Sequence, residues 1–326
     1  MALMAAIRSM QLLRGGEIIT SPYTFSATPA AILFMGYQPV FADVDRQTFC
    51  LDPASIARVV GPDTVALMPV DLFGRLADYD RIRQMFPHLP IIQDACQAVG
   101  ATKDWLRGKV AVWSLNGGKN IPAGEGGMVL TNDDRAAMRA RLFVSHAENF
   151  EKQARESGYG KNVGINGRLN EITACVAYHG MLDLPKNNRI RRLLADELWR
   201  QLKHRSDIEI PSPGEIQHHA LYVYPLRVKN TIGAKSFVER MKRLGVEVGR
   251  GYITPTLDKY AALPAGRVPL DMARVLSEHE LCLLSQVRPP ATKADMAYLA
   301  TCIEAALDGV IPKKLRALGF VAESVF

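Results

Sequence analysis

Four side chains that could do chemistry follow two apolar, strand-like segments in the middle of the chain. Asp94 and Gln97 come after the run "LPII", and Ser114 and Lys119 come after the run "KVAVW". A lysine amine can form an imine with an aldehyde, and a carboxylate in a dry site can pair with a cationic ring nitrogen. A serine hydroxyl at a strand end can donate a hydrogen bond to a phosphate. These residue types point to a site for a flat, charged ligand.

Each of these residues also has an ordinary structural interpretation. On its own, Asp94 is typical of a capping or turn aspartate, Ser114 of a strand-terminating serine and Lys119 of a loop lysine that reaches solvent. The segment "SLNGGKNIPAGEGG" around Lys119 favours the functional interpretation, because its glycines permit close approach of the backbone to a flat ligand. The hypothesis therefore rests on the combination and order of the residues, not on any one of them.

Short apolar runs alternate with helix-like segments through the first half of the chain. Strands are predicted at 17–22, 39–45, 64–70, 89–95, 109–115 and 127–132, and helices at 28–36, 52–60 and 79–86. Continuous apolar strands between helices indicate an α/β fold with a mostly parallel sheet that is covered on both faces. Ligands of such sheets bind at the carboxyl ends of the strands, which is where Asp94, Ser114 and Lys119 occur.

The second half of the chain has a different pattern of polar and apolar residues. Residues 148–167 are polar and are predicted to form a long loop, which in a compact protein is usually functional or disordered. Further helices are predicted at about 168–204, 234–244 and 292–308, and strands at 221–228 and 246–253. We therefore expect a large ligand-binding domain over residues 1–180 and a smaller α+β domain over residues 181–326.

The amino-terminal segment has the spacing of a core-facing helix. Its apolar residues are Leu3, Met4, Ile7, Met10 and Leu13, and the helix is predicted to end at Gly15 and Gly16. The segment lacks the charged start and long apolar stretch of a targeting peptide. No stretch of the chain approaches the length of a transmembrane helix, so no membrane partner is expected.

The composition is that of an ordinary globular protein. The chain has 326 residues, of which 48% are hydrophobic and 22% charged, and its formal net charge of +7 suits anionic ligands. The basic residues are scattered and no nucleic-acid motif is present. Five widely spaced cysteines show no metal-ligand spacing and indicate reduced thiols in a cytoplasmic protein. No G-x-G-x-x-G opens a helix after a strand, which argues against a nicotinamide-dependent enzyme.

Four longer motifs connect these observations. They are "SPYTFSATPAAILFMGYQPVFADVD" (21–45), "QDACQAVGA" (93–101), "SLNGGKNIPAGEGGMVLTND" (114–133) and "GINGRLNEITACVAYHG" (164–180). In sequence and order they resemble the DegT–StrS family of sugar aminotransferases, over most of residues 3–200 and more loosely to about 308. The resemblance implies fold type I of the pyridoxal 5'-phosphate (PLP) enzymes, with a mostly parallel sheet and a smaller α+β domain.

The resemblance also implies roles for individual residues. Lys119 matches the lysine that holds PLP covalently and moves the proton during transamination, and Asp94 matches the partner of the pyridine nitrogen. Gln97 matches a position near the phenolic oxygen of the ring, and Ser114 matches the serine that binds the phosphate. Phe25 matches the aromatic residue that stacks on the ring, although a core residue is the alternative.

In the family, an asparagine of the partner subunit reaches the cofactor phosphate. Asn166 occupies that position, and Gly167 departs from the tyrosine that usually follows. The resemblance thus implies a homodimer with shared active sites. It also implies transfer of an amino group, typically from glutamate, to a keto-sugar that in most relatives is nucleotide-linked. Some relatives carry a histidine in place of the lysine and dehydrate sugars, and Lys119 argues against that branch.

Two departures from the family pattern are expected to matter. A Ser-Gly-Thr type turn that precedes the first helix in the family is missing, and "LCLLSQVRPP" occurs where a Ser-Leu-Pro segment is usual. The sequence leaves open whether the natural start lies upstream or the chain is naturally short. Loss of two charge-assisted hydrogen bonds would weaken PLP binding by about a hundredfold or more. A non-catalytic, degenerate binding or regulatory protein is therefore the alternative to an enzyme.

Overall fold

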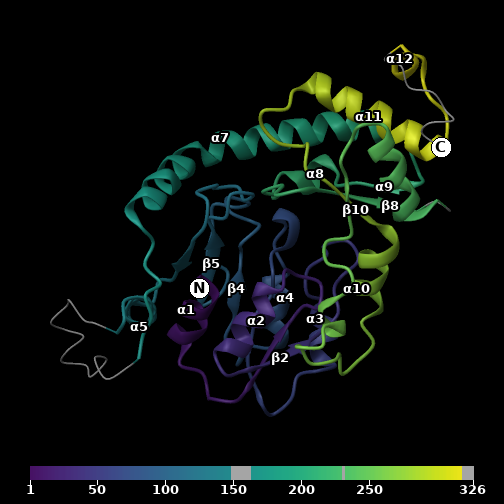
Figure 1. Ribbon diagram of the computed structural model, residues 1–326. Helices are drawn as coiled ribbons and strands as arrows, with labels where there is room; N and C mark the ends of the chain where they lie inside the picture. Colours follow the sequence, from purple (N-terminus) through teal and green to yellow (C-terminus); the bar gives the residue numbers. More distant parts are fainter. Residues whose placement is uncertain (148–162, 230–231, 318–326) are drawn as a thin grey trace.

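The computed structural model describes residues 1–147, 163–229 and 232–317 (Figure 1). A central sheet lies in the first part of the chain, and a second sheet with long helices lies in the last part. The predicted α/β class with a mostly parallel sheet and a smaller α+β region is confirmed.

The central sheet is built in two hydrogen-bonded halves. Its strands are β1 (Glu17–Thr20), β2 (Gln38–Phe41), β3 (Thr64–Leu67), β4 (Ile92–Asp94), β5 (Val110–Ser114) and β6 (Gly127–Leu130). The orders are β2-β1-β3 and β4-β5-β6, and parallel bridges from Leu67 to Ile91 and from Val70 to Asp94 join the two halves. All pairs are parallel except β5 with β6, which is antiparallel.

Apolar residues fill both faces of this sheet, as its continuous apolar strands predict. Successive side chains of a strand point to opposite faces: Ile18 packs in one core cluster and Ile19 in the other. The Ile18 face is covered by α1 (Ala2–Met10), α2 (Ala27–Phe34) and α5 (Asp134–Val144), and the Ile19 face by α3 (Pro53–Ala57) and α4 (Tyr79–Met85). The sheet is thereby sandwiched between two helical layers.

A single long helix leads to the carboxyl-terminal part. This helix, α7 (Glu171–Leu202), is capped by Asn170, whose side chain accepts a hydrogen bond from the Thr173 N–H. The predicted domain boundary at residue 180 lies inside α7 and stays a prediction. Beyond the helix, the second sheet has the antiparallel order β7-β8-β10-β9 and shares one apolar core with α7, α9 and α11.

The remaining elements belong to this part or link it to the central sheet. They are β7 (Ile208–Glu209), α8 (Pro213–Ile216), β8 (Tyr224–Val228), α9 (Gly233–Arg243), β9 (Gly249–Arg250), α10 (Asp271–Val275), β10 (Leu281–Leu284), α11 (Lys293–Asp308) and α12 (Lys313–Arg316), with short turns of 3-10 or π helix at Leu72–Gly74, Leu257–Lys259 and Leu276–Glu280.

Three sequence predictions need correction. The first helix ends at Met10 instead of Gly15, because Gln11 adopts a left-handed conformation with φ of 51°, and Leu13 is exposed. The strand predicted at 246–253 is confined to β9. Residues 281–284, which were considered only as a departure from the family pattern, form β10 in the middle of the second sheet. The predicted loop 148–167 lies mostly outside the described residues.

Two backbone hydrogen bonds join the segment before β8 to the 3-10 turn that follows β3. The N–H groups of Ala220 and Tyr222 donate to the carbonyls of Gly74 and Phe73, at 2.8 and 3.1 Å. Gly74 has a φ of +106°, and a Cβ at this position would lie 2.5 Å from the Leu221 nitrogen. Only a glycine permits so close an approach, so this residue fixes how the segment before β8 meets the sheet.

His219 is buried at the same junction and gives a pH-dependent test. Its Nδ1 accepts a hydrogen bond from the Leu221 N–H at 3.1 Å, and burial lowers the pKa of the imidazole from 6.5 to about 3. The folded protein keeps His219 neutral, whereas the unfolded chain binds a proton below pH 6.5, so stability is lost as the pH falls. His219→Asn, which keeps an acceptor near Nδ1, should remove up to about 1.4 kcal/mol of this loss per pH unit.

Urea unfolding at several values between pH 7 and pH 4 would measure the difference between the variant and the wild type. His88→Asn is the matched control, because His88 is exposed. A wild type and a His219→Asn variant with parallel pH dependence would contradict a buried neutral imidazole.

Candidate active site

One cavity of about 480 Å³ lies at the carboxyl ends of the central strands. Of the predicted site residues, Phe25, Asp94, Gln97, Ser114 and Lys119 all line it. Phe25 follows β1, Asp94 ends β4 and Ser114 ends β5. Since parallel strands bring their carboxyl ends to one edge, residues that lie far apart in the sequence meet here.

Asp94 is held by two donors and still faces the cavity. Its side chain is buried, Oδ2 accepts from the Thr28 hydroxyl at 2.8 Å, and Oδ1 accepts from the Cys96 N–H at 3.2 Å. The second contact is that of an ordinary turn aspartate. The first is made across the sheet edge from α2, so the carboxylate is fixed from two sides, with acceptor capacity left for a cation in the cavity.

Lys119 lies in a tight turn within the segment that follows β5. Its N–H donates to the Asn116 carbonyl at 2.9 Å, and its Nζ lies 4.3 Å from the centre of the Tyr222 ring. An aromatic face attracts a cationic amine, so Tyr222 both positions the lysine and stabilises its charged form. Asn116 in turn donates to Glu125 at 2.7 Å, which ties the two ends of the glycine-rich turn together.

Gln97 is connected to the carboxyl-terminal part through Tyr252. Its Oε1 accepts from the Phe73 N–H at 3.0 Å, and its Nε2 donates to the Tyr252 hydroxyl at 2.9 Å. Burial raises the pKa of Tyr252 well above its usual value, so this phenol stays protonated and keeps a hydrogen to donate. Gln97 and Tyr252 together therefore present hydrogen-bond donors to the cavity.

Hydrogen-bond donors for an anion meet at another wall of the cavity. Ser114 lies there with the first residues of α1, Met1 to Leu3. The first hydrogen bond inside α1 runs from Ala5 to Met1, so the preceding N–H groups have no acceptor within the helix. The close approach of α1 requires Gly127, where a Cβ would lie 2.8 Å from Cβ of Ala2. A hydroxyl and a helix amino terminus form the kind of wall that binds phosphate.

Asn166 does not lie in the cavity of its own chain. It is exposed beside α5, where it forms an antiparallel bridge with Ser145. The Gly167 N–H donates to the Val144 carbonyl at 2.9 Å, which fixes this segment against the end of α5. The structure therefore does not bring Asn166 together with the other predicted site residues of its own chain.

Tyr222 and Tyr252 are among the cavity residues that sequence reasoning missed. Both occur in segments that were considered only as strands of the smaller domain. No motif around Tyr222 or Tyr252 assigns either residue to a site. Each reaches the cavity only through the contact between the two parts of the chain.

The model of the DegT/DnrJ/EryC1/StrS aminotransferase family matches residues 1–303. The chain belongs to this family. The predicted resemblance and its fold type are thereby confirmed.

Three relatives illustrate the similarity within the DegT/DnrJ/EryC1/StrS family. The 3-oxo-glucose-6-phosphate:glutamate aminotransferase of Bacillus subtilis (strain 168) is 30% identical over 276 residues, which are 80% of this chain and 62% of the relative. The crystal structure of DesI with its TDP-sugar product has a TM-score of 0.83 at 24% identity and covers 97% of this chain and 80% of DesI. NtdA from Bacillus subtilis, with bound cofactor PMP, has a TM-score of 0.77 at 26% identity and covers 94% of this chain and 71% of NtdA. The chain spans about three fifths of the length of the curated relatives it matches.

The described ranges contain no cluster of three or more His, Cys, Asp or Glu side chains that could hold a metal ion. None of their helices is long and apolar enough to cross a membrane.

Asp94→Asn tests the importance of the carboxylate in this family member. The variant keeps the shape of the side chain but loses the negative charge, so we expect it to bind PLP about a hundredfold more weakly. Equilibrium titration of the protein with PLP, followed by absorbance, measures the dissociation constant. Asp104→Asn is the control, because Asp104 is exposed and pairs with Arg107 outside the cavity. Equal weakening by both substitutions would argue against a specific partner role for Asp94.

Proposed function

We propose that the protein is a PLP-dependent aminotransferase that moves an amino group from glutamate or a similar donor to a keto-sugar. The observation that carries this proposal is the meeting of Lys119, Asp94 and Ser114 in one cavity. Lys119 lies beside the Tyr222 ring, Asp94 accepts two hydrogen bonds that fix it, and Ser114 lies beside the amino terminus of α1.

The residues of the cavity fit PLP. Lys119 would supply an amine for the aldehyde, and Asp94 would accept a hydrogen bond from the protonated ring nitrogen. Ser114 and the first residues of α1 would supply hydrogen-bond donors for the phosphate. Phe25, half exposed beside the cavity, supplies an aromatic face. PLP when bound supplies an electron sink for the carbon from which the amino group leaves.

The protein's own part in the reaction is to place and move a proton. Nζ of Lys119 would take a proton from the α-carbon of the amino donor and, in the second half of the cycle, would deliver one to the carbon that receives the amino group. Tyr222 stabilises the charged form of this amine at 4.3 Å. Gln97 is buried and Tyr252 half-buried, and their hydrogen bond at the junction of the two parts of the chain would exclude water and orient the bound ring.

The substrate that we propose is a nucleotide-linked keto-sugar, in the biosynthesis of an amino sugar. DesI, which is similar over most of this chain, has been crystallised with a TDP-sugar product. The Bacillus subtilis relative carries a name that specifies a sugar phosphate. Both substrates carry phosphate, which suits the positive charge of the chain. Comparison of turnover with a nucleotide-linked and a simple phosphorylated keto-sugar separates the two.

The proposed assembly is a homodimer with shared active sites. Large apolar side chains are exposed just before α7 and along its first half, namely Leu169, Ile172, Val176, Tyr178, Met181 and Leu182. An apolar face of this extent on a helix marks an interaction surface. Asn166 lies just before it, exposed and outside its own cavity. A second copy packed on this face would receive Asn166 at its cofactor phosphate.

Lys119→Ala tests the enzyme hypothesis against the non-catalytic alternative. Wild-type protein incubated with PLP and reduced with borohydride should carry a label on the peptide that contains Lys119, and the variant should not. Turnover of a keto-sugar with glutamate should fall by about 10²–10⁴-fold or more, because the acid–base group is lost. Lys103→Ala, at an exposed position, should keep both label and turnover. Absence of label and turnover in the wild type would favour a degenerate binding protein.

Ile172→Asp together with Val176→Asp tests the dimer. Two carboxylates on the exposed apolar face oppose its burial, so light scattering should show a monomer where the wild type is a dimer.

A second experiment tests whether the two subunits share the site. Lys119→Ala and Asn166→Ala proteins, each inactive or weakened, should regain activity when they are refolded together. A mixture no more active than its components would show that Asn166 does not serve the partner's site.

A further inference from the structure

A buried arginine of α7 contacts the segment that carries Tyr222. Nη1 of Arg191 donates to the carbonyl of Leu221 at 2.9 Å and lies 3.5 Å from the carbonyl oxygen of Tyr222. The ring of Tyr222 is the one that lies 4.3 Å from Nζ of Lys119. Arg191 does not line the cavity itself, so any influence on the candidate catalytic amine passes through the backbone of Tyr222.

Arg191 is buried without a carboxylate beside it. Arg227 is also buried, but it pairs with Glu209 and Glu280 at 3.0 Å each. In the part of the chain that the structure describes, Arg191 forms no ion pair, and its buried Nε has no hydrogen-bond partner. Burial lowers the pKa of its guanidinium to about 10, so the group is still charged at neutral pH. Burial of an unpaired charge costs stability, so this position needs an explanation.

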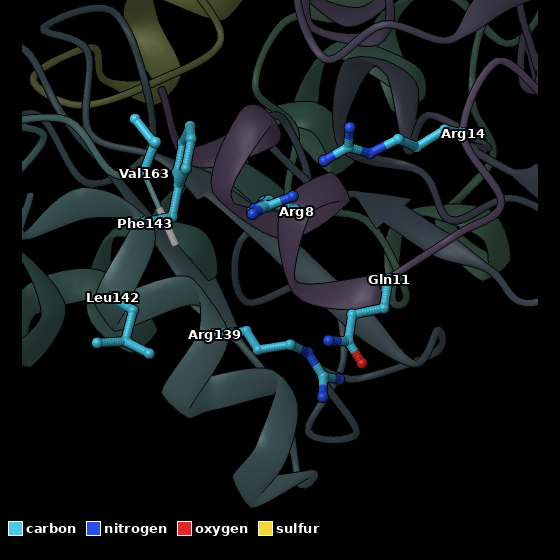
Figure 2. A pocket seen from close by; sticks show the side chains of 7 residues that line it. All are labelled: Arg8, Gln11, Arg14, Arg139, Leu142, Phe143 and Val163. Atoms are coloured by element: carbon cyan, nitrogen blue, oxygen red, sulfur yellow. The ribbon is translucent and has the colours of Figure 1, made fainter. Parts of the chain in front are cut away.

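Arginines nearer the surface carry no such cost. Figure 2 shows Arg8, Arg14 and Arg139 around a hollow of about 120 Å³ at the end of α1. Arg14 is exposed, the other two are half-buried, and the guanidinium groups of Arg14 and Arg139 lie apart from each other. These side chains keep part of their surface in water, whereas Arg191 is only 7% exposed. The place of Arg191 is therefore explained by what it holds.

The segment that Arg191 holds is itself strained. Leu221 is fully buried and has a φ of 48°, in the left-handed region that bulky side chains avoid. Its N–H donates to Nδ1 of His219 at 3.1 Å, and its carbonyl accepts from Arg191, so it is fixed from both sides. Strained backbone of this kind persists only where the surroundings hold it, and it is found next to functional residues. Here the next residue is Tyr222.

A second side chain of α7 holds the lysine side of the same contact. Asn188 precedes Arg191 by three residues, so the two lie on one face of the helix. Oδ1 of Asn188 accepts from Nδ2 of Asn120 at 2.9 Å, and both asparagines are buried. Asn120 directly follows Lys119. One face of α7 therefore contacts both the turn that carries Lys119 and the segment that carries Tyr222.

We propose that Arg191 is a positioning residue that holds the Tyr222 ring against Nζ of Lys119, while Asn188 fixes the turn that carries the lysine. The ring stabilises the charged form of the amine, so its position sets how readily the amine reacts. This inference deepens the proposed function and rests on it for one point, namely that Lys119 is the reacting amine.

The rate at which Lys119 reacts with an amine-selective acylating reagent tests the proposal. In the full chain without added PLP at pH 7, Arg191→Met should raise this rate about two- to fivefold, because the amine loses a cation–π contact of ordinary strength. Peptide mass spectrometry measures the labelling, with the exposed Lys103 as internal standard. Neither PLP nor a sugar takes part, so failure of the enzyme hypothesis would leave this readout unchanged.

Tyr222→Leu shows whether Arg191 acts through the ring. This variant should raise the labelling rate of Lys119 by a similar factor, and the double variant should be no faster than Tyr222→Leu alone. A general loosening of the structure would instead add to the effect of Tyr222→Leu. Arg189→Met is the matched control, because Arg189 is an exposed arginine of the same helix, and it should leave the rate unchanged.

Asn188→Ala gives a second test that does not depend on the folding of Arg191→Met, because alanine is favoured within a helix. It should also raise the labelling rate of Lys119, and thermal unfolding shows which variants are folded. An unchanged rate in a folded Arg191→Met or Asn188→Ala protein would overturn the proposal. So would a double variant of Arg191→Met and Tyr222→Leu whose effect is the product of the two single effects.

Discussion

The pairing of β4 with β5 is the constraint on which the candidate site depends. Parallel pairing places Ile92 opposite Val110 and Asp94 opposite Val112. The carboxylate at the end of β4 and the hydroxyl at the end of β5 therefore leave the sheet at one edge. A one-residue shift of this register would send Asp94 to the other face of the sheet, so the apolar residues that bury both strands also fix the chemistry.

The carboxyl-terminal part completes the site by closing its open side. Backbone hydrogen bonds from the segment before β8 to Phe73 and Gly74 place Tyr222 over Lys119, and the Gln97–Tyr252 hydrogen bond crosses the same junction. Phe73 is itself in a left-handed conformation, with φ of 57°, while its N–H binds Gln97. The short segment around Phe73 and Gly74 thus contacts the carboxyl-terminal part and also holds a site residue, so the position of the two parts affects the shape of the cavity.

Much of this arrangement was predictable from sequence, for physical reasons that differ between elements. The strands of the central sheet can be predicted because both faces of the sheet are buried, so each strand is a continuous apolar run. The residues that follow parallel strands lie at one edge of the sheet, where ligands bind. Asp94, Ser114 and Lys119 were therefore found. Tyr222 and Tyr252 were not, because their positions depend on long-range contacts that no local pattern encodes. Likewise, β10 is only four residues long and forms a strand through its pairing with β8 and β9, which its own sequence does not indicate.

Two buried carboxylates, Asp71 and Asp94, lie near each other and differ in how far the protein satisfies their oxygens. Asp71 accepts from the Tyr79 hydroxyl at 2.8 Å, from Gln93 at 2.7 Å and from the Ala77 N–H at 2.9 Å, and burial raises its pKa to about 7. It does not line the cavity, and its oxygens are occupied by the protein. Asp94 has fewer donors and an open side. Burial of a second carboxylate costs stability unless a cation compensates it. A fold that needed Asp94 only as a turn residue would gain by exposing it, so its burial at the cavity wall supports the proposal that it pairs with a cationic ligand.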